Sequence, residues 1–408
     1  MRALYTALMA VFAGAMRLAS LWNAKARKAV WGRSTQRKQD LDFSAMHGCV
    51  WFHCASLGEF EQARPVIEAI RKDQPDTPLL LTFFSPSGYE VRKDYALADA
   101  VVYLPWDLPG PMAAFLDRYR PAQAFVVKYE VWPNLFAALE QRGIPVVLFS
   151  AIFRPDHRYF QWYGGLFRKA LRSCSHIFVQ NAQSVELLQS IGLKQVSLAG
   201  DTRFDRVSDV AAKANRIPMV ESFLDGAWTL IAGSSWPKDE QWLSALWAMA
   251  PEGWKLIIAP HEVHESHVWA IEQVFPGAVR YSNLSLGSAA GSKVLIIDNI
   301  GMLTQLYQYG HVALVGGGFG KGIHNVLEAA VFGMPVAFGP NHKKFQEALD
   351  LLAAAGAHAL TSPGEVPGEV IAWLNDPHVR AEAGRKAREY VRAGTGATAE
   401  IRATLAAE

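Results

Sequence analysis

From residue 49 onwards, short apolar runs alternate with longer stretches in which apolar residues recur every three or four positions. Continuous apolar runs of this kind are typical of strands buried on both faces of a parallel sheet, and the intervening periodicity predicts covering helices. A first set of predicted strands comprises Cys49–His53, Leu79–Phe84, Ala100–Leu104, Ala124–Val127, Pro145–Phe149, His176–Val179 and Gln195–Ala199. A second set comprises Leu230–Ala232, Lys255–Ala259, Ala278–Tyr281, Lys293–Ile297, His311–Val315, Pro335–Phe338 and His358–Leu360. The pattern predicts an α/β protein with two doubly wound sheets.

The interval between the two sets of strands marks the domain boundary, because residues 204–226 are polar, rich in alanine and without a predicted strand. A final helical stretch over 381–408 is a candidate for crossing back to the first domain. Doubly wound domains bind ligands at the carboxyl ends of their strands, so two facing domains would form a cleft there. We therefore expect a distinct N-terminal segment over 1–40, a Rossmann-like domain over 41–205, a linker over 206–226 and a second Rossmann-like domain over 227–380.

The N-terminal segment differs from the rest of the chain. Residues 3–16 are almost wholly apolar, Arg17 interrupts the run, and residues 18–22 resume it. A basic stretch then contains Lys25, Arg27, Lys28, Arg33, Arg37 and Lys38. Arg17 makes a spanning helix marginal, and the basic stretch argues against an exported signal peptide. An interfacial helix with basic residues against anionic headgroups fits best, with Trp22 and Trp31 near the boundary, and a helix packed on the protein's own core is the alternative.

Composition adds three constraints. The 408 residues, half of them hydrophobic, are enough for two cores. The net charge of +2 gives no field that would favour nucleic acid. Three scattered cysteines are too few for a disulfide framework or a structural zinc site, which indicates a reducing, cytoplasmic location.

A glycine cluster follows the predicted strand His311–Val315. It runs from Gly316 to Gly322 and leads into a predicted helix over 325–332, an arrangement that lets backbone N–H groups approach a phosphate. The spacing fits neither a Walker A loop nor a dinucleotide-binding fingerprint. A tight strand-to-helix turn is the plain alternative for Gly317 and Gly318, but three polar side chains close behind favour ligand binding: His324, Asn325 and Glu328. On a helix, Asn325 and Glu328 would share a face.

Glu59 lies in the first turn of the helix predicted after strand Cys49–His53. A carboxylate there is favoured as the anion by the helix dipole, which suits a base. Ser56 and Glu59 also have the spacing of a capping box, and the local sequence alone favours that structural role. Gly58 is less expected in a plain cap and hints at close approach by a ligand.

Other polar groups follow strand ends. Lys128, Glu130 and Trp132 come after strand Ala124–Val127, either as a pocket wall or as a solvated Lys–Glu pair. Arg203 follows the last strand of the first set and has the fork geometry to hold a carboxylate or phosphate. Ser234 follows the first strand of the second set.

His261 opens a histidine-rich segment after strand Lys255–Ala259. His261, His264, Glu265 and His267 suggest a metal site, but the His-Glu-x-x-His spacing is not met. A helix start with His261 facing the ligand is the better interpretation, and no metal site is predicted.

Taken together, these residues resemble a known family, the 3-deoxy-D-manno-oct-2-ulosonic acid (Kdo) transferases of lipopolysaccharide synthesis, which are membrane-associated GT-B glycosyltransferases. The resemblance covers essentially the whole chain. It rests on the ordered motifs Ser56–Glu59, Glu130–Asn134, Gly200–Asp205, Gly233–Ser234 and Gly316–Glu328 with Gly339–Pro340.

The resemblance implies transfer of Kdo from CMP-Kdo to the lipid A precursor, with inversion, no cofactor and no essential metal. It further implies an enzyme at the cytoplasmic face of the inner membrane, with an N-terminal acceptor domain and a C-terminal donor domain. Glu59 matches the general base of the family, which overrides the capping-box interpretation, and Ser56, Gly58 and Glu130 fall on the acceptor side. The donor side receives Arg203, Ser234, His261, Gly317, Gly318, Asn325 and Glu328.

Two departures affect the donor contacts. The chain has Pro260-His261 where many members have Pro-Arg-His, and Gly-Asp-Thr-Arg at 200–203 where Gly-Asn-x-Lys is common. Two alternatives are a GT-B-like nucleotide-sugar epimerase and a non-catalytic nucleotide-sugar binding protein at the membrane.

Overall fold

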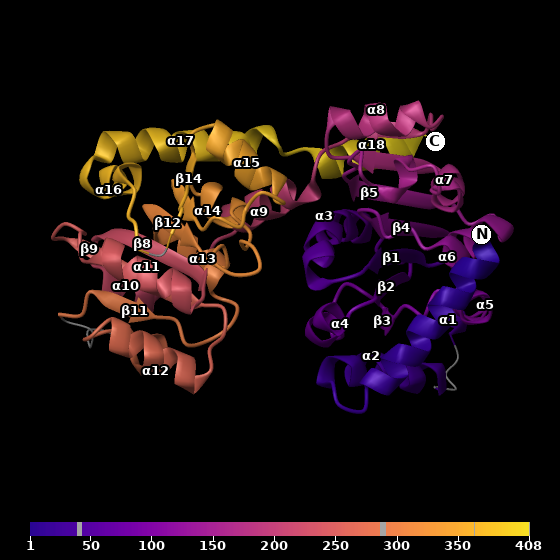
Figure 1. Ribbon diagram of the computed structural model, residues 1–408, viewed down its shortest axis with the longest axis horizontal. Coiled ribbons are helices and arrows are strands. Elements are labelled where there is room, and N and C mark those ends of the chain that lie inside the picture. The colour runs from indigo at the N-terminus through magenta and orange to yellow at the C-terminus, as the bar shows by residue number, and fades with distance from the viewer. Residues whose placement is uncertain (39–42, 286–290, 363, 408) are drawn as a thin grey trace. The chain divides into compact units, whose positions relative to one another are not determined.

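The structure is a computed structural model that describes residues 1–38, 43–285, 291–362 and 364–407. The chain forms two compact units, Met1–Arg206 with Thr395–Glu408, and Val207–Gly394. Each unit contains a seven-stranded sheet whose strand pairs are all parallel. Helices lie on both sides of each sheet (Figure 1). The predicted α/β class with two doubly wound sheets is confirmed.

The sheet of the first unit has the strand order β3-β2-β1-β4-β5-β6-β7. Its strands are β1 (Val50–Cys54), β2 (Leu79–Phe83), β3 (Ala100–Tyr103), β4 (Gln123–Val127), β5 (Val146–Ala151), β6 (His176–Val179) and β7 (Val196–Leu198). Every residue of β1 is buried, because successive side chains alternate between two covered faces. Trp51 packs with Leu80 and Phe115 in one cluster, whereas Phe52 packs with Phe60 in the other.

Helices connect these strands and cover both faces. They are α3 (Leu57–Asp73), α4 (Pro86–Arg92), α5 (Pro109–Tyr119), α6 (Pro133–Gln141), α7 (Gly165–Arg172) and α8 (Ala182–Ser190). Proline stands at the first helical position of α4, α5 and α6, where its missing N–H costs nothing and its fixed φ suits the helix.

The sheet of the second unit has the order β10-β11-β9-β8-β12-β13-β14. Its strands are β8 (Trp228–Ser235), β9 (Trp254–Pro260), β10 (Val279–Arg280), β11 (Val294–Ile296), β12 (Val312–Val315), β13 (Val336–Phe338) and β14 (Ala357–Ala359). The longer helices are α11 (Pro237–Trp247), α12 (Glu265–Val274), α15 (Gln346–Ala353), α16 (Gly368–Asn375) and α17 (Pro377–Ala393), with the short α13 (Leu303–Leu306) and α14 (Leu327–Ala330).

The interval expected as a linker is helical. It contains α9 (Thr202–Ala212) and α10 (Pro218–Leu224). Val220 and Phe223 of α10 are buried, and Ile217 donates its backbone N–H to the Tyr309 hydroxyl at 2.6 Å. Pro218 at the first helical position and the buried apolar side of α10 explain why this polar interval folds onto the second unit.

The chain returns to the first unit after α17. Helix α18 (Ala397–Ala407) contacts α3, and Ile401 is fully buried in the same cluster as Phe52 and Phe60. Asp205 fixes the return, because its carboxylate accepts hydrogen bonds from the N–H groups of Gly396 and Thr398 at 2.6 and 2.7 Å.

Helix α1 (Arg2–Ala19) lies against the first unit by one side only. Tyr5 donates to the buried carboxylate of Asp107 at 2.8 Å, Arg2 donates to Asn134 at 2.9 Å, and Met9 and Ala13 are buried. The other side exposes Leu4, Leu8, Val11 and Leu18. Among the described residues, α1 is the single helix long and apolar enough to cross a membrane by length and composition. Helix α2 (Ala24–Lys38) follows and contacts β3.

Candidate functional site

The predicted site residues follow the strands at which the order of each sheet reverses. In each sheet, the strand order reverses between a central pair of strands, β1 and β4 in the first and β8 and β12 in the second. The carboxyl ends of such a pair diverge into helices on opposite faces, which leaves the crevice where open α/β sheets bind ligands. Glu59 follows β1 and Glu130 follows β4, while Ser234 is the next-to-last residue of β8 and the glycine cluster follows β12.

Glu59 is a nearly buried carboxylate in the first turn of α3. It is 9% exposed and accepts a hydrogen bond from the backbone N–H of Ala55. Ser56 is the N-cap residue, but its hydroxyl makes no capping bond, so the predicted capping box is only half formed. A Cβ at Gly58 would meet only the Ser56 hydroxyl, at 4.0 Å, so packing within the chain does not require glycine there.

Glu59 and Glu130 influence each other's protonation. Burial raises the pKa of Glu59, against the opposing effects of the Ala55 N–H and of Lys128. Burial, followed by the negative charge of Glu59, raises the pKa of Glu130 to about 8. Two interacting carboxyl groups, one buried and one partly buried, cannot both ionise easily, so at neutral pH the pair retains a proton.

Lys128 provides the positive charge beside this carboxyl pair. Its backbone is in the left-handed region, at φ +58°, which is unusual for a residue with a side chain. Strain of this kind is found where a side chain must be aimed, often at functional sites. The indole N–H of Trp132 has no hydrogen-bond partner of normal geometry among the described residues, yet it lies near enough to Glu130 to lower its pKa. Lys128 and Trp132 thus complete a cluster of two carboxyl groups, one cation and one indole N–H.

Arg203 is engaged elsewhere in the first unit. Its guanidinium donates to the buried carboxylate of Asp201 through Nε at 2.9 Å and Nη2 at 2.8 Å. Asp201 also accepts from Gln62 at 2.9 Å, and the charge of Arg203 helps to lower the pKa of Asp201 against the effect of burial. A ligand of Arg203 would therefore share it with Asp201, and its predicted donor contact stays a prediction.

In the second unit, the end of β8 and the glycine cluster are in close backbone contact. A Cβ at Gly316 would come within 2.2 Å of the Ser234 carbonyl oxygen, and one at Gly318 within 2.5 Å of Gly339. Ser234 itself has φ +52° and Gly317 has φ +91°. These glycines are therefore required by the turn itself, which is the plain alternative stated above. Within the described residues, however, the backbone N–H groups of Gly318 and Phe319 donate no hydrogen bond, so they are available to an anion.

Asp239 holds the glycine cluster and was not predicted. Its Oδ2 accepts from the N–H of Gly317 at 2.8 Å and from the N–H of Trp236 at 2.9 Å, and its Oδ1 is buried without a partner in the described chain. Burial raises the pKa of Asp239 to about 6. A sequence signal for this role was present. Trp236 is the N-cap residue of α11, which begins at Pro237, and Asp239 comes three residues after Trp236, at the spacing of a capping box.

An aromatic stack lines the same strand ends. His261 stacks on Trp236 with ring centroids 4.8 Å apart and on His324 at 4.5 Å. Trp236 donates its indole N–H to His324 Nε2 at 3.3 Å, and burial together with His261 lowers the pKa of His324 to about 4. A flat wall of aromatic rings beside free N–H groups is suited to a ligand that has both a planar ring and a phosphate.

The predicted helix over 325–332 was wrong in extent. Helix α14 spans only Leu327–Ala330, because the Asn325 side chain accepts the Leu327 N–H at 3.2 Å in a turn and Gly333, at φ +78°, ends the segment. Asn325 therefore precedes the helix rather than sharing a helical face with Glu328. The two side chains still meet, with Asn325 Nδ2 donating to Glu328 Oε1 at 3.0 Å.

The histidine-rich segment does not converge. His267 Nε2 contacts the buried carboxylate of Glu240 at 3.0 Å, which also accepts from Ser235, whereas His261 faces the aromatic stack. Over the described ranges, no group of three or more His, Cys, Asp or Glu side chains could hold a metal ion.

Comparison with known proteins adds to this geometry. The family model for 3-deoxy-D-manno-octulosonic-acid transferase (kdotransferase) matches residues 24–206. The 3-deoxy-D-manno-octulosonic acid transferase of Bordetella pertussis is 29% identical over 379 residues, covering 86% of this chain and 85% of its own. The transferase of the same name from Haemophilus influenzae is 27% identical, covering 85% and 84%. The chain is therefore similar to Kdo transferases over most of its length.

The fold of this chain has solved counterparts. The UDP-GlcNAc 2-epimerase of Neisseria meningitidis superposes with a TM-score of 0.63 at 16% identity, covering 88% of this chain and 100% of its own. At that identity the likeness shows the fold alone, which is the GT-B-like arrangement of two parallel α/β sheets. The similarity to Kdo transferases identifies the chain as a glycosyltransferase, and the epimerase alternative has support only at the level of fold.

Proposed function

We propose that this chain moves Kdo from CMP-Kdo to the lipid A precursor, lipid IVA, with inversion at the anomeric carbon. The similarity to 3-deoxy-D-manno-octulosonic acid transferases over most of the chain supports the transferred sugar. The observation that carries the mechanism is the interacting carboxyl pair, Glu59 and Glu130, beside Lys128 at the reversal point of the first sheet.

Glu59 is the proposed general base. It accepts the proton of the acceptor hydroxyl while that oxygen forms the new bond to the anomeric carbon of Kdo. The bond from that carbon to the phosphate oxygen breaks, and CMP leaves as a phosphate monoester anion. Attack on the face opposite the leaving group inverts the configuration. General base catalysis of this kind contributes about 10² to 10⁴ in rate.

Glu130 and Lys128 influence the ionisation of the proposed base, Glu59. With Glu130 protonated at neutral pH, its neighbour Glu59 can be the ionised member of the pair. Lys128 lowers the pKa of Glu59, which keeps the base ionised despite burial. We place Ser56 and Gly58 beside the acceptor on the same strand end, as the resemblance implied.

The second unit is proposed to hold CMP-Kdo. The free N–H groups of Gly318 and Phe319 suit the phosphate, and the stack of Trp236, His261 and His324 suits the planar base. Ser234, Gly317, Asn325 and Glu328 lie on the same strand ends, and Arg203 is proposed as a further contact to the anionic donor.

The enzyme is proposed to work at the cytoplasmic face of the inner membrane, with α1 lying in the interface. Its apolar stripe is exposed, while hydrogen bonds from Tyr5 and Arg2 and the burial of Met9 hold the other side to the first unit. A spanning helix would have to give up these contacts, so an interfacial helix is favoured.

The decisive test is transfer from CMP-Kdo, generated in situ, to a tetra-acylated lipid A precursor, read by mass spectrometry. The wild type should add one or more Kdo units, and Glu59→Gln should lose activity by about 10² to 10⁴-fold while keeping CMP binding. Glu68→Gln is the matched control, because Glu68 lies on the same helix in a solvent-accessible pair with Arg64. Full activity of Glu59→Gln would refute the base assignment, and no transfer by a folded, CMP-binding wild type would refute the proposed reaction.

A further inference from the structure

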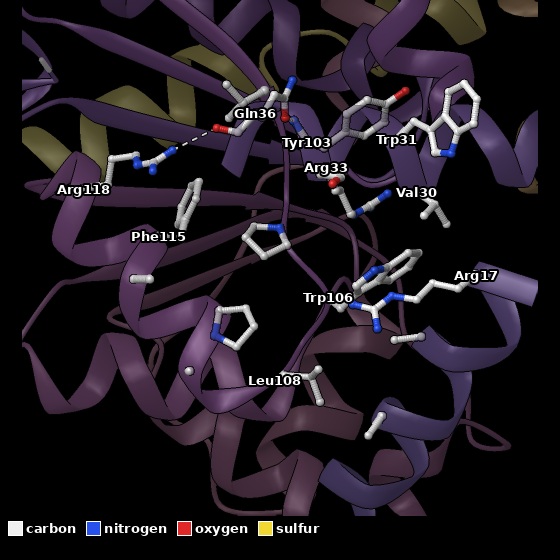
Figure 2. A pocket seen from close by; sticks show the side chains of 18 of the residues that line it. Arg17, Val30, Trp31, Arg33, Gln36, Tyr103, Trp106, Leu108, Phe115 and Arg118 are labelled. Carbon is white, nitrogen blue, oxygen red and sulfur yellow. Dashed lines mark hydrogen bonds between the residues drawn. The ribbon is translucent and has the colours of Figure 1, made fainter. Parts of the chain in front are cut away.

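A pocket of about 890 Å³ lies in the first unit between α1, α2, the end of β3 and α5. Figure 2 shows Arg17 from α1, Trp31 and Arg33 from α2, Trp106 from the loop after β3 and Phe115 from α5 around it. This volume is within the range of ligand pockets, about 300 to 1,000 Å³. The residues assigned to the acceptor and the donor do not line it.

The side chains of α1 leave the pocket open. Besides Arg17, α1 lines it only with the small residues Ala10, Ala13 and Gly14, and a Cβ added at Gly14 would meet nothing within 4 Å. Opposite them, Trp106 and Phe115 supply large, mostly buried aromatic surfaces. A space bounded by small residues on one side and rings on the other fits a flexible apolar chain.

The pocket adjoins the exposed apolar stripe of α1. Gly14 is three residues from Val11 and four from Leu18, so it borders the stripe on the helix surface. Trp31 on α2, which also lines the pocket, is 64% exposed. A membrane that meets the stripe would therefore also meet the mouth of the pocket.

The charges around the pocket have one sign. Among the described residues that line it, three are arginines and none is acidic. Arg33 is occupied, since it donates to the carbonyl oxygens of Leu104, Ala29 and Phe84. The guanidinium of Arg17, by contrast, makes no hydrogen bond or ion pair within the described chain, and Figure 2 shows it among the side chains that line the pocket. An unpaired guanidinium at the entrance of an apolar pocket suits a phosphate whose chain is inside.

Aromatic rings separate the pocket from the carboxyl pair. Trp106 meets Phe84 edge-on at 5.6 Å, and Phe84 stacks on Trp132 at 4.9 Å, next to Glu130. Neither Phe84 nor Trp132 lines the pocket. A molecule in this pocket is therefore walled off from Glu59 and Glu130, which argues for a bound lipid other than the one that reacts.

We infer that this pocket binds one acyl chain of an anionic phospholipid of the bilayer, with the lipid phosphate at Arg17. The bound lipid would fasten α1 to the membrane from the protein side of the helix, in addition to the exposed stripe. The occupant follows from the open apolar volume, the free guanidinium, the absence of acidic lining residues in the described chain and the continuity with the α1 stripe.

The test uses the full chain and phosphatidylcholine vesicles with phosphatidylglycerol, a small share of which has a diazirine at the middle of one acyl chain. After irradiation, labelled residues are located by peptide mass spectrometry. Label is expected on Trp106 and Phe115, which are 9% and 6% exposed, as well as on the α1 stripe. Gly14→Phe fills the pocket and should lower the Trp106 and Phe115 label by about tenfold, or about 1.4 kcal/mol, while stripe labelling persists.

Ala15→Phe is the matched control, since Ala15 is exposed and does not line the pocket, and it should leave the pocket label unchanged. Arg17→Gln should reduce the preference for phosphatidylglycerol over a phosphatidylcholine probe by about fivefold. Label confined to the stripe, or pocket label unchanged in Gly14→Phe, would overturn the inference. Displacement of the probe by a trace of unlabelled tetra-acylated lipid A precursor would also overturn it, because the pocket would then belong to the acceptor.

Discussion

The negative charge of Glu59 raises the pKa of Glu130, and Lys128 lowers the pKa of both carboxyl groups. The two carboxyl groups, which follow adjacent strands, therefore titrate as a pair. Such coupling gives the pair apparent pKa values that belong to neither residue alone. It also makes the pH dependence of the enzyme a direct report on this cluster.

Removal of the Lys128 charge should shift the activity profile. Lys128→Met raises the pKa of Glu59, so a larger fraction of the base is protonated at a given pH. We expect the acidic limb of kcat/KM to move up by about one pH unit, with activity falling on that side. Lys128→Arg keeps the charge and should keep the limb in place. The pH–rate profiles of the two variants decide the matter, and superimposable limbs in wild type and Lys128→Met would contradict the expectation.

Glu130 should make stability fall as pH rises. Its folded pKa of about 8 is above the ordinary 4.5, so the folded state holds the proton more tightly than the unfolded state between these values. Wild type therefore loses stability across this window, and Glu130→Gln, which cannot ionise, does not. We expect the variant to gain about 1 to 3 kcal/mol relative to wild type from pH 5 to pH 8, measured by urea unfolding. Parallel curves for the two proteins would count against the raised pKa.

The glycine cluster offers a matched pair of substitutions. A Cβ at Gly318 would come within 2.5 Å of Gly339, whereas one at Gly320 would come no nearer than 3.4 Å to Gly317. Gly318→Ala should lower the free energy of unfolding of the second unit by about 1 to 3 kcal/mol and weaken CMP binding. Gly320→Ala should be close to wild type in thermal unfolding and in calorimetric CMP titration. Equal behaviour of the two variants would mean that the loop relaxes easily.

Membrane attachment should depend on the stripe of α1. Leu8 is 60% exposed and makes the stripe apolar at its centre. Burying a leucine contributes about 1.5 to 3 kcal/mol, so Leu8→Asp should lower binding to anionic vesicles at least about tenfold in sedimentation. Leu349→Asp, on α15 of the second unit, is an exposed leucine control that should bind like wild type. Thermal unfolding of both should be unchanged, and undiminished sedimentation of Leu8→Asp would argue against an interfacial α1.

Most of the fold could be predicted because each strand is a short apolar run that is set off in the sequence from the helical stretches on either side. The local signals at Ser56–Glu59 and at Lys128–Glu130 also located the carboxyl pair, since each follows a predicted strand. What the sequence could not show were contacts between distant segments. Asp239 accepts the N–H of Gly317, 78 positions away, and Trp236 meets His324 across 88 positions. The helix expected from Asn325 failed for a local reason, because a side-chain turn competed with the first helical turn.

Helix α18 belongs to the first unit but follows the second unit in the sequence, so the first unit is completed only after the second has been synthesised. Ile401 fills a fully buried position among Phe52, Phe60 and Phe149, yet it emerges from the ribosome after the entire second unit. The first 206 residues therefore leave the ribosome with an apolar gap in their core, which stays open while 188 more residues, Val207–Gly394, are made. The second unit is continuous in sequence, so it can fold before the first unit is complete. Until α18 has been synthesised, the exposed apolar core of the nascent first unit must be protected from aggregation.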